Sequence, residues 1–192
     1  MIEDLCFHVV DVVQNSVTAG ADRVEITITV SRRRDLVRLE INDNGRGMDA
    51  ETLRRVQDPF YTTKTGKKVG LGIPLMKETA LHCDGDFEMS SRLGKGTRIR
   101  ADYRFSHIDT PPMGPVAEMM LQLIAATPGV DMVFAWISDA GRFDVSTGGI
   151  REQIGDMSLT HPAVLGFLRE YLEENLKGLS ADPEIGPGPR PV

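Results

Sequence analysis

The sequence predicts an α+β protein in which helices pack on a sheet built from strand hairpins. Residues 23–30 and residues 36–42 alternate apolar and polar side chains, which is the period of a half-buried strand, and a tip of three arginines joins them. Residues 86–91 and residues 97–105 repeat this arrangement around a Gly-Lys-Gly turn. Segments with apolar residues at helical spacing precede, separate and follow the two hairpins, so helices and strands are expected to share a core.

The composition is that of an ordinary globular protein. The chain has 192 residues, 41% of them hydrophobic, which allows one large domain or one domain with a smaller appendage. Its formal charge of -6 argues against a nucleic-acid partner, because phosphate binding calls for a basic surface. No apolar stretch approaches the roughly 18 residues of a membrane span, and no secretory signal opens the chain. We therefore expect a cytoplasmic protein with no membrane partner, in which Cys6 and Cys83 are reduced thiols.

The first predicted helix has an apolar face and a separate polar stripe. The apolar face, within residues 3–18, contains Leu5, Val9, Val12 or Val13, Ser16 and Val17. The polar stripe contains Asp4, His8, Asp11 and Asn15. An Asn four residues after an Asp can present its amide oxygen to a hydrated magnesium ion, while the carboxylate orients a water. The same stripe is also typical of the solvated side of an amphipathic helix, and both interpretations stay open.

A carboxylate beside two glycines follows the second strand. The stretch Asp43-Asn44-Gly45-Arg46-Gly47-Met48 ends the strand of residues 36–42 and precedes a short helix that begins near Asp49. Glycine lets the backbone approach a flat ligand, and a carboxylate can accept a hydrogen bond from the exocyclic amine of an aromatic base. An ordinary turn has the same composition, so the stretch alone does not decide between a base pocket and a turn.

A polar, glycine-containing segment precedes the helix predicted over residues 73–82. Residues 62–68 are cationic and poor in apolar anchors, and we expect them to be mobile. Gly70 and Gly72 then lead directly into the helix, whose first backbone N–H groups lie at the positive end of its dipole and suit a phosphate. Lys64 would add a cationic donor. The alternative is a flexible loop in front of a helix.

Thr97 stands at the start of the last strand of the second hairpin. Its hydroxyl is placed to reach a base or a bridging water if the strand end borders the pocket. Threonine is also simply a good strand residue, so Thr97 carries a functional meaning only together with the other elements.

Taken together, these stretches resemble the ATP-binding domain shared by DNA gyrase, the heat-shock chaperones of the ninety-kilodalton class, sensor histidine kinases and mismatch-repair MutL, the GHKL superfamily. The resemblance covers about residues 1–105. Its motifs occur in the family's order: an asparagine box at residues 11–15, a glycine box at residues 43–47, a phenylalanine box at residues 59–64 with lid glycines at residues 70–72, and a last box at residues 94–97.

The resemblance implies a fold and a set of roles. The fold is a two-layer α/β sandwich of the Bergerat type, with ATP and Mg²⁺ as cofactors. The implied roles are magnesium binding by Asn15, a hydrogen bond to the adenine amine by Asp43, admission of base and ribose by Gly45 and Gly47, phosphate binding by Lys64 with the amides of Gly70, Leu71 and Gly72, assistance at the adenine by Thr97, and further pocket contacts by Met48 and Phe60. Asp11 takes the position where the family's hydrolases usually have Glu, and the shorter carboxylate is expected to place the attacking water less well.

A second segment follows the double proline at residues 111–112. Residues 1–106 are predicted to be the ATP-binding domain, residues 113–178 a small α+β unit made of a helix, a hairpin and a helix, and residues 179–192 a disordered tail rich in proline and glycine. The small unit could be a domain of its own or an extension packed on the first. We expect it to contact a protein partner.

Three functions remain open on the sequence. In the first, the protein hydrolyses ATP or transfers its γ-phosphate to a protein partner, with Asp11 as the base. In the second, it is a non-catalytic module whose ATP-closed lid controls the binding of a partner protein. In the third, the pocket has decayed and binds nothing, although four ordered motifs argue against decay.

Overall fold

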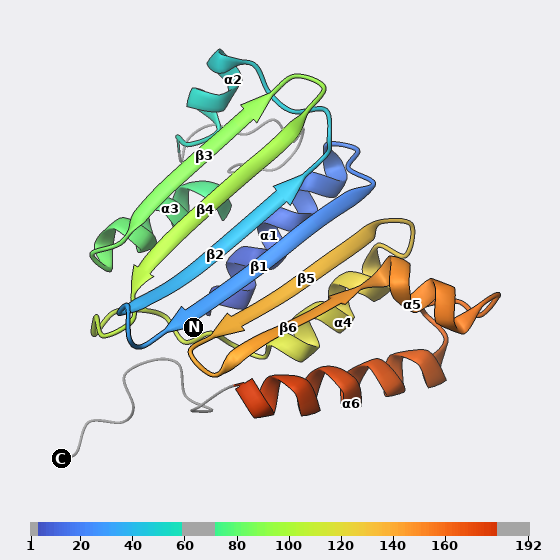
Figure 1. Ribbon diagram of the computed structural model, residues 1–192. Helices are drawn as coiled ribbons and strands as arrows, with labels where there is room; N and C mark the ends of the chain where they lie inside the picture. The colour runs from blue at the N-terminus through green and yellow to red at the C-terminus, as the bar shows by residue number, and fades with distance from the viewer. Residues whose placement is uncertain (1–3, 59–71, 180–192) are drawn as a thin grey trace.

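One six-stranded mixed sheet organises the computed structural model, which describes residues 4–58 and 72–179 (Figure 1). Its strands are β1 (Arg23–Ser31), β2 (Leu36–Asp43), β3 (Asp86–Arg92), β4 (Gly96–Arg104), β5 (Asp131–Ser138) and β6 (Gly141–Ser146). Across the sheet they follow the order β3-β4-β2-β1-β5-β6. Neighbouring strands pair antiparallel except β1 and β5, which run parallel, and this makes the sheet mixed.

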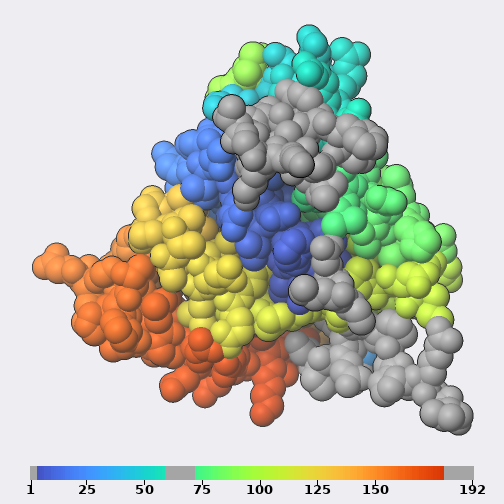
Figure 2. Space-filling view, turned by 180° about the vertical axis from the view of Figure 1, so that it is seen from behind, coloured from blue at the N-terminus to red at the C-terminus, as the bar shows by residue number. Residues whose placement is uncertain are grey.

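The helices of the described residues cover one face of this sheet (Figure 1). They are α1 (Leu5–Thr18), α2 (Ala50–Arg55), α3 (Gly72–His82), α4 (Val116–Ala126), α5 (Thr147–Ile154) and α6 (Pro162–Leu179). Seen from behind, α1 in blue lies between α3 in green and α4 in yellow (Figure 2), and α1 packs against both. A mixed sheet with helices on one face confirms the predicted two-layer α/β sandwich.

The core lies between the helices and the sheet. Val24, Ile26 and Ile28 of β1 point toward the helices and are at most 1% exposed, as the alternation in the sequence predicts. The opposite face carries charges that pair across strands. Arg38, for example, donates from Nε and Nη2 to the two carboxylate oxygens of Asp102, each over 2.7 Å. Paired charges are stable in contact with water, so this face needs no second helical layer.

The strand register brings together two predicted site residues. Asp43, the last residue of β2, lies opposite Val24 on β1 and opposite Thr97 on β4. Asp43 and Thr97 therefore meet at one end of the sheet, although 53 residues of chain separate them. One end of each of the two predicted hairpins therefore lies at the same end of the sheet.

Residues 113–178 extend the same sheet. Strand β5 pairs with β1 from Asp131 opposite Arg23 to Ser138 opposite Val30, and its Phe134 and Trp136 enter the same buried cluster as the β1 side chains. Helices α4 and α6 pack on this part of the sheet. Of the two arrangements that the sequence left open, the structure shows an extension that shares the sheet and the core.

Two further observations complete the fold. Within residues 4–58 and 72–179, no helix is long and apolar enough to cross a membrane. Disorder was predicted for residues 179–192, but Leu179 is the last residue of α6, and residues 180–192 lie outside the described residues.

Candidate functional site

The carboxylate of Asp43 is held by three hydrogen-bond donors. Its Oδ1 accepts from the backbone N–H of Gly45 over 2.9 Å and from that of Thr97 over 3.2 Å, and its Oδ2 accepts from the hydroxyl of Ser16 over 2.7 Å. An ionised carboxylate offers about four acceptor positions, so one further donor can be accommodated. The side chain is half-buried and cannot turn without breaking these bonds. The arrangement suits a fixed acceptor for a ligand amine.

Ser16 is a site residue that the sequence analysis missed. It lies on the inner face of α1, is 3% exposed, and was assigned to the apolar face of that helix. Its hydroxyl also lies 3.2 Å from the carbonyl oxygen of Val12, but the contact with Asp43 is shorter and ends on a charge. The sequence feature that could have identified Ser16 is a hydroxyl at a position where helical periodicity predicts an apolar side chain.

Two turns pack backbone to backbone beside Asp43. Gly47 has φ +64°, and a Cβ there would lie 2.0 Å from the carbonyl oxygen of Arg92. Gly96 has φ +86°, and a Cβ there would lie 1.8 Å from the carbonyl oxygen of Asp43. The N–H of Gly94 donates to the carbonyl oxygen of Arg46 over 2.8 Å. Gly47 is therefore required for the packing of the two turns, in addition to the ligand contact expected from the sequence.

Thr97 and Ser91 lie beside Asp43 on the side of β3 and β4. The hydroxyl of Ser91 donates to the carbonyl oxygen of Gly96 over 2.8 Å and accepts from the N–H of Met48 over 2.9 Å. Because this uses the single hydrogen of Ser91, the Thr97 hydroxyl donates to Ser91 Oγ over 3.0 Å. The lone pairs of Thr97 Oγ1 then remain for a water or a ligand donor. Ser91 was not singled out in the sequence.

Helix α1 contacts both Asp43 and the start of α3. The Oδ2 of Asp11 lies 2.8 Å from the position that a Cβ on Gly72 would occupy, so Asp11 borders the first residue of α3. Asp11 and Asn15 are half-buried, whereas Gln14 on another side of α1 is exposed. The rise of an α-helix puts residue 11 about 7.5 Å from residue 16 along the axis. One helix can therefore contact both the base and the phosphates of a nucleotide.

The first turn of α3 provides the helix N-terminus that is expected at a phosphate site. Its backbone N–H groups lie at the positive end of the helix dipole, beside the Asp11 carboxylate. Four of the predicted phosphate and pocket residues lie outside the described residues, namely Phe60, Lys64, Gly70 and Leu71. The described part of this site therefore consists of Gly72, Asp11 and Asn15.

The donors near Asn15 fit a divalent cation that keeps most of its own ligands. Among the described residues no group of three or more His, Cys, Asp or Glu side chains could hold a metal ion. Asn15 and Asp11 offer hard oxygen donors on one side of α1. Mg²⁺ usually takes one or two protein ligands and completes its octahedron with phosphates and waters. The residues present fit Mg²⁺ that arrives with a nucleotide.

Burial keeps the two cysteine thiols from ionising. Burial raises the pKa of Cys6 on α1 to about 12, with a smaller contribution from Asp4. Burial also raises the pKa of Cys83. Thiolate chemistry is therefore not available from either residue near neutral pH. By contrast, the backbone N–H of Thr52 holds the pKa of Asp49, the N-cap of α2, below its usual value.

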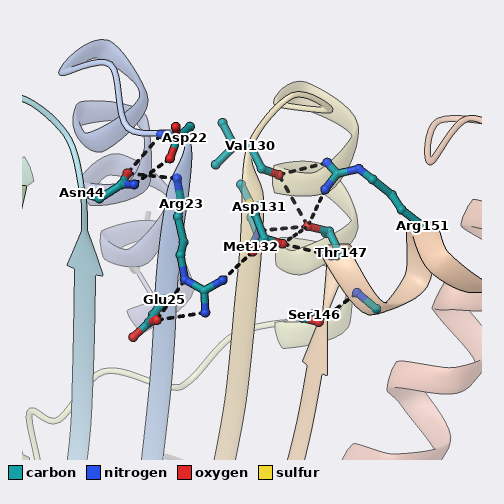
Figure 3. A network of polar contacts seen from close by, with 12 residues as sticks. Asp22, Arg23, Glu25, Asn44, Val130, Asp131, Met132, Ser146, Thr147 and Arg151 are labelled. Atoms are coloured by element: carbon teal, nitrogen blue, oxygen red, sulfur yellow. Dashed lines mark hydrogen bonds and ion pairs between the residues drawn. The ribbon is translucent and has the colours of Figure 1, made fainter.

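A polar network joins the turn after Asp43 to the beginning of β1 (Figure 3). The Oδ1 of Asn44, the neighbour of Asp43, accepts from the N–H groups of Asp22 over 3.1 Å and Arg23 over 3.0 Å. Its Nδ2 donates to Asp22 Oδ1 over 2.6 Å. Asn44 thus fixes the turn after Asp43 to the start of the neighbouring strand.

The same network continues into the C-terminal extension (Figure 3). Arg23 Nη1 donates to Asp131 Oδ2 over 2.6 Å. Asp131 Oδ1 accepts from the N–H of Gly148 over 2.9 Å and contacts the buried hydroxyl of Thr147 over 3.0 Å, and this caps α5. Thr147 Oγ1 in turn accepts from the N–H of Met132 over 2.8 Å. The extension and the turn after Asp43 therefore share one anchor at the beginning of β1.

Comparisons with known proteins agree with this geometry. The family model for histidine kinase-, DNA gyrase B- and HSP90-like ATPases matches residues 3–107. Sensor protein kinase FleS of Pseudomonas aeruginosa is 38% identical over 89 residues, which are 46% of this chain and 22% of that protein. Sensor histidine kinase YxdK of Bacillus subtilis is 32% identical over 106 residues, which are 52% of this chain and 32% of that protein. The chain thus spans about a third or less of these relatives.

A solved structure supports the fold alone. The crystal structure of the N-terminal domain of a DNA repair protein has a TM-score of 0.52 to this chain, with 16% sequence identity, and covers 75% of this chain and 52% of that chain. The family match covers more than half of the 192 residues, and it agrees with the resemblance seen in the sequence motifs. The chain belongs to the family of histidine kinase-, DNA gyrase B- and HSP90-like ATPases, and residues 3–107 form its ATP-binding domain.

Proposed function

We propose that this protein binds ATP with Mg²⁺ and either hydrolyses it or transfers its γ-phosphate to a protein partner. The observation that carries the proposal is the Asp43 carboxylate, which three donors hold in place with an acceptor position left for an adenine amine. Thr97 and Ser91 lie beside this carboxylate and supply further polar contacts at the base. Such a fixed acceptor distinguishes adenine, which has an exocyclic amine at that position, from guanine, which has a carbonyl there.

The placement of α1 supports the assignment of the phosphate end. Asp11 borders the first residue of α3, and Ser16 contacts the base-binding carboxylate. A triphosphate at the start of α3 would meet the Asp11 carboxylate, and the two negative groups would repel each other. A Mg²⁺ ion held by Asn15 and the phosphates would relieve that repulsion, and when bound it would polarise the γ-phosphate. The residues bind and orient the nucleotide around this ion.

Asp11 is the residue that we assign to proton transfer. Its carboxylate would accept a proton from an attacking water or from a partner's nucleophilic group, or would orient that group. Because Asp is one methylene shorter than the Glu usual in hydrolases of the family, we expect slow hydrolysis unless a partner completes the site. The matched relatives are named as sensor kinases, which favours transfer to a protein. We place the partner's contact on residues 113–178 and the activity in the cytoplasm, without nucleic acid.

Incubation with γ-labelled ATP and Mg²⁺ tests this proposal, with free phosphate, labelled protein and bound nucleotide followed together. Asp11→Asn should abolish phosphate release or transfer and leave nucleotide affinity largely intact. Glu78→Gln, which changes an exposed carboxylate on α3, is the matched control and should behave as the native chain. Loss of nucleotide affinity in Asp11→Asn, with turnover per bound nucleotide unchanged, would contradict the role given to Asp11.

A nucleotide-gated adaptor is the second candidate. It is favoured by the shared anchor, because Asn44, Arg23 and Asp131 connect the base-binding turn to the extension. In this function ATP changes the surface offered to a partner, and turnover is incidental. Nucleotide-dependent partner binding that survives Asp11→Asn would favour the adaptor, and partner binding that requires Asp11 would favour the enzyme.

A further inference from the structure

Most arginines on the strands are paired with carboxylates. Ion pairs are found for Arg23, Arg38, Arg98, Arg100, Arg104 and Arg142. Their charges are therefore neutralised locally, as expected for a chain with a formal charge of -6. Against this background, cations that have no carboxylate partner stand out as places where an external anion could bind.

Three such cations gather beside the base-binding pocket. Arg46, Arg92 and Lys95 are all exposed, and their side chains take part in none of the ion pairs found within residues 4–58 and 72–179. They come from the two turns that pack backbone to backbone next to Asp43. At the end of the sheet where α2 lies in Figure 1, these turns form an edge of the molecule.

The two turns hold these side chains on a rigid base. The N–H of Gly94 donates to the carbonyl oxygen of Arg46 over 2.8 Å, and the N–H of Lys95 donates to that of Arg92 over 2.9 Å. Gly47 packs so closely on Arg92 that a Cβ would overlap its carbonyl oxygen. Only the long side chains remain free to adjust, so an anion meets three cations whose backbone positions are already set.

An apolar side chain lies among the cations. Leu93, between Arg92 and Gly94, is 63% exposed, more than any other exposed large hydrophobic residue of the described part of the chain. We call Arg46, Arg92, Leu93 and Lys95 the rim. A cationic surface with one projecting apolar side chain complements a segment that carries carboxylates around an apolar residue.

We propose that the rim is a docking surface for an acidic protein segment that contains an apolar residue. A protein is favoured over a nucleic acid because Leu93 offers an apolar contact that a phosphate backbone does not use. A short acidic segment can also place its carboxylates away from the exposed Asp49 and Glu51, whereas a continuous phosphate backbone cannot. The chain as a whole also repels polyanions, so binding would be confined to the rim. A segment bound to the rim would lie beside Asp43, and this contact is separate from the one that we propose for residues 113–178. The rim can bind such a segment whether or not the pocket is filled.

The probe for this proposal is a fluorescein-labelled dodecapeptide with two central leucines, two glutamates on each side of them and serine at the other positions. Fluorescence anisotropy with the full chain, without nucleotide, should show saturable binding at low salt that weakens as salt is added. Replacing Arg46, Arg92 and Lys95 together by Gln should weaken binding about tenfold, as expected for three exposed charge pairs. Leu93→Ser should weaken it separately, and the peptide should shift the amide signals of Gly94 and Lys95 in NMR spectra.

The matched control lies at the opposite end of the same sheet. Arg33 and Arg34 are exposed cations at the β1–β2 turn, and replacing both by Gln removes two positive charges, one fewer than the rim variant, without touching the rim. The control variant should bind the peptide as the native chain does. An equal loss in both variants, or no saturable binding at low salt, would overturn the proposal. Tighter binding of a single-stranded oligonucleotide than of the peptide to the same residues would also overturn it, in favour of a nucleic-acid ligand.

Discussion

At the scale of single residues, the candidate site depends on how the Asp43 carboxylate is held. A free carboxylate at a strand end would rotate and exchange its partners with water. Here the backbone N–H groups of Gly45 and Thr97 and the hydroxyl of Ser16 fix both oxygens. A ligand amine therefore meets an acceptor that is already oriented, and no ordering entropy opposes the hydrogen bond.

Ser16→Ala should weaken nucleotide binding. The substitution removes a hydrogen bond to a charged acceptor, worth about 1.5 kcal/mol to the folded protein, and leaves Asp43 freer to rotate. Affinity should fall by up to about tenfold, because binding must then order that carboxylate. Calorimetric titration with an ATP analogue and Mg²⁺ measures the change. Ser90→Ala, at an exposed position of β3, is the control and should bind as the native chain. Native affinity in Ser16→Ala would show that Asp43 needs no support from α1.

A comparison of Gly47→Ala with Gly94→Ala separates the cost of an unfavourable backbone conformation from the cost of disrupted packing. Both glycines have positive φ, so both substitutions cost about 1–2 kcal/mol in the left-handed region. Only at Gly47 would the new Cβ also collide with the backbone of Arg92, whereas nothing lies within 4 Å at Gly94. Gly47→Ala should therefore lower the unfolding temperature and nucleotide affinity clearly more than Gly94→Ala. Equal effects would mean that the close packing of the two turns is unimportant.

The sequence singled out Asp43, Gly45, Gly47 and Thr97 but not Ser16 and Ser91, which contact Asp43 and Met48. Asp43 and Thr97 could be found because family motifs and strand ends mark them, and the register then brings them together. Ser16 and Ser91 act through contacts between elements far apart in the chain, and periodicity describes only which face of its own element a residue occupies. Whether a buried serine belongs to the site depends on which residue its hydroxyl contacts in the folded protein.

At the scale of elements, the extension is fastened to the ATP-binding domain by caps as well as by strand pairing. Helix α5 begins at Thr147 and contains Gly148 and Gly149, which disfavour a helix. Helical propensity therefore does not predict a helix there. The helix forms because Asp131 and Ser146 accept hydrogen bonds from its first N–H groups, over 2.9 Å and 3.1 Å. By contrast, alternation of apolar and polar residues was sufficient to predict β1, β2, β3 and β4.

Asp131→Ala should destabilise the protein through α5. It removes a cap, worth about 1 kcal/mol, and also the partner of Arg23. We expect the free energy of unfolding, measured by urea denaturation, to fall by about 1–2 kcal/mol. Asp144→Ala, which breaks an exposed pair with Arg142 on β6, is the control and should lower the free energy of unfolding less, because water screens exposed pairs. An equal or larger loss in Asp144→Ala would contradict the capping role.

At the scale of the whole molecule, the ATP-binding domain and the extension form one folded body. Strand β1 is an inner strand only because β5 pairs with it, and the first turn of α1 donates from Leu5 and Cys6 to the carbonyl oxygens of Pro112 and Met113, each over 2.9 Å. The sequence predicted a boundary at the double proline and could not show that the chain returns to the same sheet. Apolar alternation identifies strands and does not name their partners.

A fragment that ends at residue 107 should therefore fold poorly. It would expose the β1 edge and the apolar surface that β5 and α4 cover, and it would lose the acceptors of the first turn of α1. Since α1 carries Asp11, Asn15 and Ser16, nucleotide binding should be lost with the fold. Size-exclusion chromatography and circular dichroism measure this, and a monomeric fragment with native nucleotide affinity would show that the extension is dispensable.

The most direct test of the account is calorimetric titration of the full chain and of Asp43→Asn with ATP and GTP in the presence of Mg²⁺. The native chain should bind ATP and discriminate against GTP, because Asp43 accepts from the adenine amine. In Asp43→Asn the amide places a donor where an acceptor is required, and ATP affinity should fall by more than about tenfold. Native binding of ATP by Asp43→Asn, or no binding of ATP by the native chain, would contradict the account.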